Sequence, residues 1–390
     1  MKYKIINKCT VCKKKILRKN KLLLKNLPIT EVFFSKPKSN KKINFNQKLQ
    51  YCEECNHLSL AYQYDVLNFY NDSYLNSSNS FSNQYSNDFF LKFIKKHIEK
   101  KKYNIIEIGA NDLYLLKKFQ KNCAQIVAID PCIKENKTIK NIIYKKQFIE
   151  KIKRHEIKFI PDLVFCNQTL EHVENPIDSL YHISKFGNKN TKYFFQFPSC
   201  ESIIGRNAFD QIHHQHLNYF SLNSISKILK KFGLSIIDHD INELHYGSLM
   251  IYFKISKSNK KNKFLKNKIN LNKKYQKYQK YIENIIDIVK EYKKRNHKVY
   301  AIGASLMTPI LDYHLNGLIK LSDNILDDDK EKINKYFPNI RSKIKSLKNT
   351  DLTNAVVIIS ATASSITTRK LVSIVENKKS KIIIVPSLSF

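Results

Sequence analysis

The clearest pattern in the chain lies at residues 103–119, where an apolar run gives way to a helical repeat. Residues 103–108 contain three isoleucines and are typical of a short buried strand. Gly109 interrupts the run, and apolar residues then recur with helical spacing after Asn111 and Asp112, which suit a helix start. The pattern predicts a strand, a tight turn and a helix whose free N–H groups could bind a ligand.

Further apolar runs predict that strands and helices alternate through most of the chain. A helical stretch precedes residue 100, and residues 225–232 predict a short amphipathic helix. Residues 257–297 are rich in lysine but periodic, and they predict one long helix between two domains. The other predicted strands lie at 126–130, 159–167, 193–198, 234–238 and 248–255 and, in a second unit, at 298–305, 324–327, 355–360 and 381–386.

These patterns predict an α/β protein with a Rossmann-like core and a smaller α/β domain at its C-terminal end. A length of 390 residues suits two or three domains, and 42% hydrophobic residues are enough for their cores. We expect four parts, at residues 1–70, 71–256, 257–297 and 298–390.

Two acidic residues flank the predicted turn. Glu107 ends the first strand, where a carboxylate would meet a cationic or hydroxyl-bearing ligand, and Asp130 ends the second strand. In doubly wound sheets the second acid binds ribose hydroxyls. Glu107, Gly109 and Asp130 together resemble the S-adenosylmethionine site of class I methyltransferases.

The charge and the start of the chain limit the possible partners. The net charge is +36, but only six of the 69 basic residues are arginine, the residue that nucleic-acid interfaces favour. Lysine is spread along the whole chain, so we expect a solvated surface that attracts anionic substrates and consider nucleic acid an unlikely partner. No run of eighteen apolar residues and no apolar signal core is present, so we expect no membrane helix and a cytoplasmic location.

Four cysteines near the N-terminus form two CxxC pairs, Cys9 with Cys12 and Cys52 with Cys55. Two such pairs are typical of a tetrahedral zinc site in which four thiolates leave no open position, so the metal would be structural. The alternatives are two disulfides or unpaired cysteines. A cytoplasmic location argues against disulfides.

Three of the twelve histidines fall within four residues, at His213, His214 and His216. A general acid or base needs only one imidazole directed at the substrate, with a pKa near the working pH. The alternatives are a metal site, which adjacent histidines suit poorly, and a polar loop. His245, beside Gly247, adds another imidazole.

The order of these parts resembles the sugar-nucleotide C-methyltransferases of deoxysugar biosynthesis over nearly the whole chain. The motifs that carry the resemblance lie at residues 74–78, 107–112, 167–172, 210–221, 245–249 and 303–305. In that family the zinc module and the C-terminal domain frame the sugar nucleotide, and the central domain holds S-adenosylmethionine.

The resemblance implies roles for individual residues. It implies an acid/base group, residues that bind the cofactor and residues that bind the substrate, in addition to the four zinc ligands. These residues are His216, His214, His172 and Gln215 for catalysis; Tyr74, Ser78, Glu107, Gly109, Asn111, Asp130 and Asn167 for the cofactor; and His213, His245, Gly247, Ser248, Gly303 and Ser305 for the substrate. Residues 70–78 alone would equally suit a polar linker with two packing tyrosines.

The chain departs from the family at three positions. Leu113 stands where the family has glycine, and His213 and Gln215 replace the Tyr and the Glu of a Tyr-His-Glu-His loop. The implied reaction is retained in kind: a base removes a proton beside the keto group of a nucleotide-linked keto-sugar, and the enolate accepts the methyl group. The alternatives are an O- or N-methyltransferase on a sugar or amino-sugar, and a non-catalytic zinc-bearing binding protein. The sugar, the methylated atom, the nucleotide base and the oligomeric state are left open.

Overall fold

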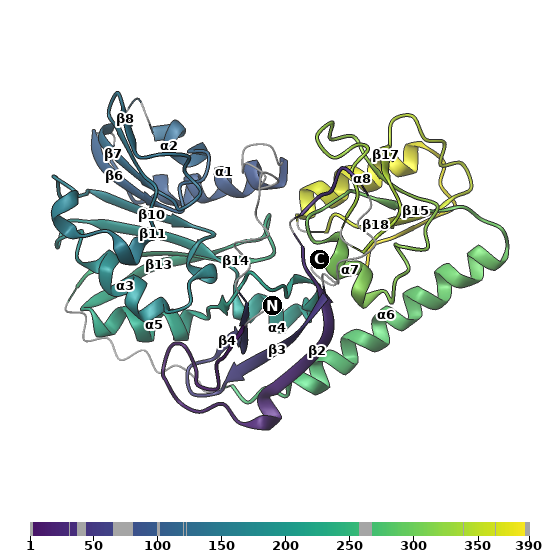
Figure 1. Ribbon diagram of the computed structural model, residues 1–390, viewed down its shortest axis with the longest axis horizontal. Coiled ribbons are helices and arrows are strands. Elements are labelled where there is room, and N and C mark those ends of the chain that lie inside the picture. Colours follow the sequence, from purple (N-terminus) through teal and green to yellow (C-terminus); the bar gives the residue numbers. More distant parts are fainter. Residues whose placement is uncertain are drawn as a thin grey trace.

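The computed structural model describes residues 3–30, 32–36, 44–64, 81–99, 102–119, 121, 123–256, 267–337, 339–362 and 364–386. A large sheet domain and a smaller one lie side by side, and N-terminal strands pack beneath both (Figure 1). One apolar core is shared by N-terminal strands, helix α4, helix α6 and the C-terminal domain. The N-terminal strands, the central domain and the C-terminal domain are therefore packed together.

The described residues of the central domain form an eight-stranded sheet in the order β13-β14-β11-β10-β6-β7-β9-β8. Strands β11, β10, β6, β7 and β9 are parallel, whereas β14, β13 and β8 each pair antiparallel with a neighbour. The chain leaves β6 on one side for β7 and later returns on the other side for β10. Ligands bind at such switch points, outside the carboxyl ends of the strands.

Helices cover both faces of this sheet. Helices α1 and α2 pack on the face that carries Ile105, and α3 and α5 pack on the face that carries Ile106. The predicted α/β class with a Rossmann-like core is therefore confirmed. The elements are α1 Phe81–Lys95, β6 Tyr103–Ile108, α2 Tyr114–Phe119, β7 Cys123–Ile129, β8 Lys137–Ile139, β9 Ile142–Lys145, β10 Leu163–Asn167, α3 Pro176–Ser184, β11 Lys192–Phe197, α4 Cys200–Arg206, α5 Leu222–Lys231, β13 Leu234–Asn242 and β14 Ser248–Ile255.

The N-terminal module is a small antiparallel sheet that takes one strand from the central domain. Its strands β2, β3 and β4 are joined at the edge by β12, where Asn218 pairs with Ser59 and Tyr219 with Leu58. Residues 209–221, which carry the clustered histidines, are thus tied to the module. The elements are β1 Tyr3–Ile5, β2 Lys21–Pro28, β3 Asn44–Cys52, β4 His57–Leu60, β5 Tyr62–Tyr64 and β12 Asn218–Tyr219, and β1 pairs with β5.

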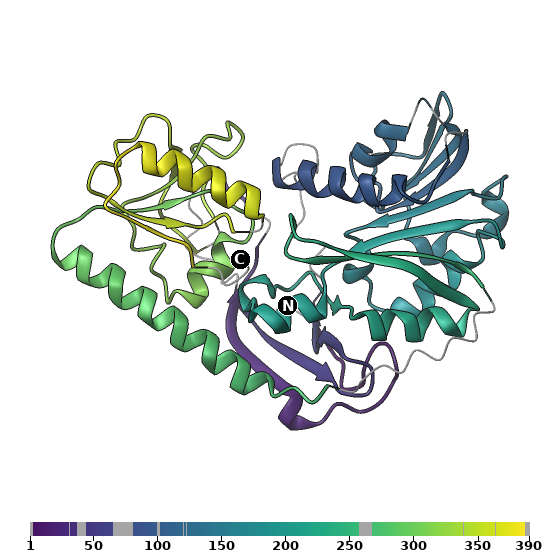
Figure 2. The same cartoon turned by 180° about the vertical axis from the view of Figure 1, so that it is seen from behind.

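Helix α6, Leu271–Lys294, runs from beneath the N-terminal module to the C-terminal domain, as both views show (Figures 1 and 2). Its buried residues recur at helical spacing and enter the shared core. No helix in the described part of the chain is both long and apolar enough to cross a membrane.

The C-terminal domain is a five-stranded parallel sheet in the order β17-β16-β15-β18-β19. Four of these strands fall in the ranges that the apolar runs predict. Strand β17 was not predicted because it is a three-residue strand with one buried side chain. The elements are β15 Val299–Ile302, α7 Thr308–His314, β16 Asn324–Asp327, β17 Ile344–Ser346, β18 Val356–Ile359, α8 Ser365–Asn377 and β19 Ile382–Ile384.

Candidate active site

A cavity of about 940 Å³ lies outside the carboxyl ends of β6, β7 and β10. Its walls come from all three parts of the molecule. The central domain supplies Gly109 and Asp130, the N-terminal module supplies Tyr64, and the C-terminal domain supplies Leu306 and Met307. This volume lies within the range of small-molecule and cofactor sites.

The turn after β6 requires glycine. Gly109 has a φ of +72°, and a Cβ atom there would lie 1.8 Å from Thr169 Oγ1. The turn is held by Asp130, whose Oδ2 accepts from the backbone N–H of Asn111 at 2.9 Å and whose Oδ1 accepts from Cys132 N–H at 2.7 Å. Because a carboxylate has about four acceptor positions, Asp130 keeps capacity for a ligand on the cavity side.

Glu107 fits a ligand that donates hydrogen bonds or carries positive charge. Its side chain is 3% exposed, and its Oε2 has no hydrogen-bond partner among the described residues. Burial raises the pKa of Glu107 well above its usual value, and the nearby Asp130 and Asp112 carboxylates raise it further. A cationic ligand such as S-adenosylmethionine would offset both effects.

Asn167 lines the cavity, but neighbouring side chains already engage its amide. Its Nδ2 donates to Asn87 Oδ1, and its Oδ1 accepts from Gln196 Nε2 at 2.8 Å. Gln196 Oε1 in turn accepts from Asn242 Nδ2 at 2.8 Å. Asn167 thus joins α1 to the strand ends and shapes the wall. The other predicted cofactor residues, Tyr74 and Ser78, lie outside the described residues.

Imidazoles gather on another part of the cavity lining. His172, His213, His216 and His245 all line the cavity together with Gln215. The ring centroid of His216 is 3.9 Å from that of His213 and 4.9 Å from that of His172. Burial lowers the pKa of His216 well below its usual value, and His213, His172 and His245 lower it further. Burial alone lowers the pKa of His245 to about 4.

Two backbone contacts fix the geometry of this wall. The Nδ1 atom of His172 lies 3.0 Å from the Gln215 carbonyl oxygen, and Gln215 Nε2 donates to the Thr30 carbonyl at 3.1 Å. The first contact joins the loop after β10 to residues 213–216. The second joins those residues to the N-terminal module.

The structure does not bring His214 into the cavity. Its Nε2 lies 3.0 Å from the Leu27 carbonyl oxygen and its Nδ1 lies 3.2 Å from Gln47 Nε2, both in the N-terminal module. Burial lowers its pKa to about 4. His214 is therefore a packing residue, and the predicted acid/base group is corrected to leave it out.

Four of the predicted substrate residues form scaffold around the cavity and do not line it. Gly247 packs on α4, where a Cβ atom would lie 2.6 Å from Ser202 Oγ. Ser248 Oγ accepts from Gln168 Nε2 at 3.0 Å and donates to the His245 carbonyl at 2.9 Å. Gly303 and Ser305 form the turn after β15, and the next two residues reach the cavity.

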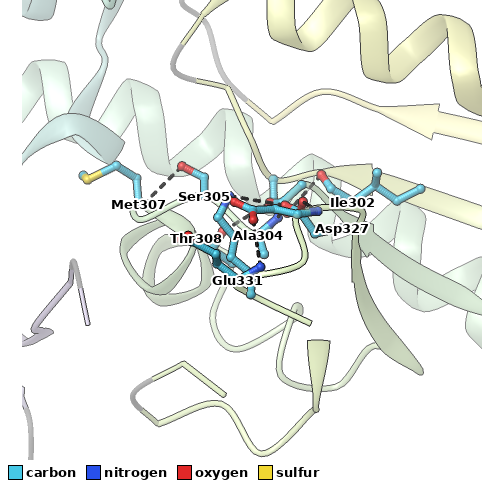
Figure 3. Close-up of polar contacts among 11 residues, drawn as sticks. Ile302, Ala304, Ser305, Met307, Thr308, Asp327 and Glu331 are labelled. Carbon is cyan, nitrogen blue, oxygen red and sulfur yellow. Dashed lines mark hydrogen bonds and ion pairs between the residues drawn. The ribbon is translucent and has the colours of Figure 1, made fainter. Parts of the chain in front are cut away.

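Figure 3 shows that second turn. The backbone N–H of Ala304 donates to Asp327 Oδ2 at 2.7 Å, and the N–H of Met307 donates to Ser305 Oγ at 3.3 Å. Both contacts stay within the C-terminal domain. Gly303 and Ser305 therefore set the path by which Leu306 and Met307 approach the methyltransferase core.

Sequence reasoning did not single out several residues of the cavity wall. Tyr64, Leu306 and Met307 reach it only because three parts of the chain pack together. Glu171 was missed as well. It is fully buried, and its carboxylate and the rings of His172 and His216 lie within 4.8 Å of one another. Its position next to His172, after a buried strand, was the one available signal.

The four N-terminal cysteines lie together. The Sγ atoms of Cys9 and Cys55 are 3.6 Å apart and those of Cys12 and Cys52 are 3.5 Å apart, and none of the four forms a disulfide. Zinc–thiolate bonds of about 2.3 Å in a tetrahedron place sulfurs about 3.8 Å apart. The cluster is therefore compatible with a zinc ion.

Hydrogen bonds join the first cysteine knuckle to the histidine wall. Thr10 Oγ1 donates to Asn218 Oδ1 at 2.8 Å, and Asn218 Nδ2 donates to the Val173 carbonyl at 2.7 Å. Val173 follows His172, and Asn218 lies two residues after His216. His57 Nε2 lies 3.0 Å from Thr10 Oγ1 and is buried beside them. The cysteine cluster thus supports both histidine-bearing loops.

Comparison with known proteins agrees with this geometry. Residues 80–239 match the family described as a methyltransferase domain. The C-methyltransferase NovU of Streptomyces niveus is 24% identical over 156 residues, which are 38% of this chain and 36% of that protein. The match thus spans about a third of the length of this curated relative.

Solved structures resemble the chain over its central part. The N-methyltransferase NodS of Bradyrhizobium japonicum WM9, in complex with S-adenosyl-L-homocysteine, covers 48% of this chain and 94% of its own, with 13% identity and a TM-score of 0.37. The magnesium protoporphyrin IX methyltransferase of Synechocystis PCC 6803 with bound S-adenosylmethionine covers 45% and 80%, with 14% identity and a TM-score of 0.35.

The family match, together with the sheet order and the Gly109 turn, confirms the predicted enzyme class. Residues 80–239 therefore form a class I methyltransferase domain.

Proposed function

We propose that the protein transfers a methyl group from S-adenosylmethionine to a carbon atom of a nucleotide-linked keto-sugar. The observation that carries this proposal is one cavity with two different walls. One wall has the Gly109 turn with Glu107 and Asp130, and the other has imidazoles around His216, whose own pKa is lowered. The similarity to a C-methyltransferase supports the same choice. Methylating a carbon requires a base, whereas the cofactor site alone would serve any methyltransferase.

His216 is the proposed base. Burial and the surrounding imidazoles keep its ring neutral near pH 7, so its nitrogen lone pair is available to accept a proton. Removing a proton beside the keto group breaks the C–H bond and leaves an enolate on the substrate. Gln215, at the same wall, keeps a second amide N–H beside the one that it donates to Thr30, and this donor would stabilise the enolate oxygen.

The two ends of the cavity have different proposed roles. When bound, S-adenosylmethionine supplies an electrophilic methyl group. Glu107, Gly109 and Asp130 would hold it, so that its methyl group points toward the histidine wall. Tyr64, Leu306 and Met307 form a third side that is mainly apolar and aromatic and suits the faces of a sugar or a base.

The pH dependence of this proposal has a definite sign. The neutral imidazole is the active form, and the pKa of His216 is lowered from 6.5. Activity should therefore rise with pH below about 6.5 and be level through neutrality, because the ring has already lost its proton there. A rate limb centred above pH 7 would contradict His216 as the base.

The decisive experiment uses a panel of nucleotide-linked keto-sugars in deuterium oxide, with and without S-adenosylmethionine. The wild type should exchange the hydrogen beside the keto group and, with the cofactor present, methylate that carbon. His216→Asn should lose both activities by about 10²–10⁴-fold while still binding the cofactor. His214→Asn is the matched control, because it changes a histidine of the same loop that packs away from the cavity.

The outcomes separate the alternatives. Methyl transfer without exchange, unaffected by His216→Asn, would favour an O- or N-methyltransferase. Absence of cofactor binding in the wild type would favour a binding protein.

Cys9, Cys12, Cys52 and Cys55 are the proposed ligands of one structural zinc ion. The knuckle turns support this assignment, because the residues that follow the second cysteine of each pair, Lys13 and Asn56, have positive φ values of 60° and 54°. Such turns direct both thiolates of a CxxC pair to one point. With four thiolates around it, the ion would have no open position for chemistry.

A further inference from the structure

Gln215, which precedes His216, is an amide and offers that ring no negative charge. A carboxylate nevertheless lies beside the ring, since Glu171 reaches the same cluster from the loop after β10. We propose that Glu171 is a positioning residue for proton transfer, and that its buried carboxylate orients the ring of His216. This inference rests on the proposed role of His216 as a base.

The first argument is burial. The side chain of Glu171 has 0% exposure, and an ionised carboxylate is costly in such surroundings unless a partner compensates it. One ligand atom from each of Glu171, His172 and His216 lies within 4.8 Å of the other two. A buried negative charge at this position would therefore interact with these two imidazoles.

The second argument is the orientation of His172. With its Nδ1 atom 3.0 Å from the Gln215 carbonyl oxygen, this ring must carry its proton on Nδ1, since a carbonyl can only accept. The lone pair of its other nitrogen, Nε2, then faces the rest of the cluster. An ionised carboxylate only accepts, so beside these two rings it must accept from a ring N–H of His216, and this fixes the orientation and tautomer of that ring.

The third argument is the charge that develops during the reaction. When the C–H bond breaks, its electron pair remains on the substrate as the enolate and the proton moves to His216. The resulting imidazolium lies beside three other imidazoles, those of His213, His172 and His245, which offer no negative charge. The Glu171 carboxylate supplies that charge from the protein side, and no further reactant is needed.

Tyr219 lies near both His216 and the Glu171 carboxylate. Its ring lies 5.9 Å from that of His216, edge to face. Burial raises the pKa of the Tyr219 hydroxyl, and the Glu171 charge raises it further, although contact with the His213 backbone opposes the shift. Among the described residues, the titratable groups shown near His216 are His172, His213, His245, Tyr219 and Glu171, and Glu171 is the one carboxyl group among them.

The test compares Glu171→Gln with the wild type, both zinc-loaded, in deuterium exchange and in methyl transfer. We expect kcat to fall about 10- to 100-fold with the KM for S-adenosylmethionine unchanged, as for the loss of a residue that orients an active group. The rate limb assigned to His216 should also move to lower pH, because the protonated ring loses its stabilising charge. Adding Gln215→Glu should restore part of the rate and move the limb back.

Glu201→Gln is the control. Glu201 accepts a hydrogen bond from Leu222 N–H at 3.0 Å outside the cavity, so this variant should change stability and leave the pH profile in place. If Glu171→Gln does not fold, Glu171→Asp keeps the charge but withdraws it by one methylene. We then expect a lower kcat with the limb unmoved, and an unchanged kcat would overturn the proposal.

Two results would count against the role of Glu171, and one would count against the proposed function. An active wild type with a Glu171→Gln variant of equal kcat and unshifted pH profile refutes it and leaves the proposed function intact. A wild type with no exchange on any keto-sugar refutes the proposed function instead. The second result against Glu171 would be a divalent ion bound in addition to zinc. If EDTA removes this ion from the wild type, and Glu171→Gln loses both the ion and the activity, the cluster is a metal site.

Discussion

Two turns in this molecule begin with the same pairing of a glycine and an acid but have different surroundings. One follows β6 in the central domain, and the other follows β15 in the C-terminal domain. The glycines, Gly109 and Gly303, have φ values of +72° and +93°. Their N–H groups donate at 2.8 Å to the residues that precede the two acids, Ile129 and Leu326.

The acids also behave alike. Asp130 accepts from Asn111 N–H at 2.9 Å and from its own second neighbour Cys132 at 2.7 Å. Asp327 accepts from Ala304 N–H at 2.7 Å and from its own second neighbour at 2.9 Å. Figure 3 shows the second of these turns. In both domains the acid at the end of the second strand holds the turn that follows the first.

The surroundings are what differ. A Cβ atom at Gly109 would meet the Thr169 side chain at the edge of the cavity, whereas one at Gly303 would meet apolar atoms of Ala361 and Leu371. Asp130 faces the cavity, but Asp327 has Lys332 at 3.7 Å. The turn alone therefore predicts a fold. It predicts a ligand site only where the packing leaves space and the acid lacks a counter-ion from the protein.

The largest expected effect is the loss of zinc, which should damage the histidine wall and leave the Gly109 turn intact. Cys52→Ser should abolish stoichiometric zinc and unfold the N-terminal module, because structural zinc contributes about 10–16 kcal/mol of apparent binding free energy to folding. Methyl transfer should be lost through the Thr10–Asn218 link, while the Gly109 turn, which the module does not build, should still bind S-adenosylmethionine. Elemental analysis, limited proteolysis and calorimetry measure these three results.

Cys123→Ser is the control for that variant. Cys123 is buried outside the cluster and donates to the Phe119 carbonyl at 3.0 Å, which a hydroxyl can also do. Full zinc content and normal proteolysis are expected. Zinc well below one equivalent in wild type expressed with sufficient metal would rule out the cysteine assignment.

The second effect tests the glycines directly. Gly109→Ala should weaken S-adenosylmethionine binding at least about 100-fold, because the new Cβ must displace Thr169 and a left-handed residue other than glycine costs about 1–2 kcal/mol. Gly303→Ala should lower the free energy of unfolding and leave that affinity nearly unchanged. Titration calorimetry measures the affinity of both variants, and chemical denaturation measures their stability. An equal loss of affinity in both variants would contradict a difference in function between the two turns.

The fold could be predicted from the sequence where the pattern is long enough. The strand, turn and helix at residues 103–119 were predicted, as were four strands of the C-terminal sheet. Strands β12 and β17 were missed because strands of two and three residues show no alternation. The pairing of β12 with β4 is also a contact between distant parts of the chain, which local pattern does not encode.

The site could be predicted only in part. Glu107, Gly109 and Asp130 were found because the ends of neighbouring parallel strands meet at one edge. His214 and His216 could not be separated, because a loop without regular repeat gives no side-chain direction. Only the packing of the loop on the N-terminal module turns His214 toward Leu27. Leu306 and Met307 reach the cavity, and Glu171 reaches the ring of His216, for the same tertiary reason.

The third prediction compares the acids. Asp130→Asn removes the charge and presents an amide donor or a weaker acceptor to two N–H groups. A charged hydrogen bond contributes about 1.5–3 kcal/mol, so we expect roughly ten- to a hundredfold weaker S-adenosylmethionine binding. Asp327→Asn should cost stability of similar size without changing that affinity. An unchanged dissociation constant in Asp130→Asn would remove Asp130 from the cofactor site.

The smallest effect concerns the fourth residue after each glycine. Leu113 has a φ of +64°, whereas Met307, at the same place in the second turn, has a φ of −87°. The left-handed backbone explains why glycine would suit the first position, and why leucine there is strained by about 1–2 kcal/mol. Leu113 is nonetheless 7% exposed, and burying a leucine side chain contributes about 1.5–3 kcal/mol.

Leu113→Gly removes both the backbone strain and the apolar contact. These two changes partly cancel, so we expect a loss of about 1 kcal/mol in the free energy of unfolding. Leu113→Ala loses the apolar contact but keeps the strain, so it should be about 1 kcal/mol less stable than the glycine variant. This order is the reverse of the usual one, and denaturant titration of the two proteins detects it. Because Leu113 belongs to the apolar core beneath the turn, S-adenosylmethionine affinity should change less than about threefold in either variant. A clear gain in affinity for Leu113→Gly would show instead that the leucine side chain narrows the cofactor site.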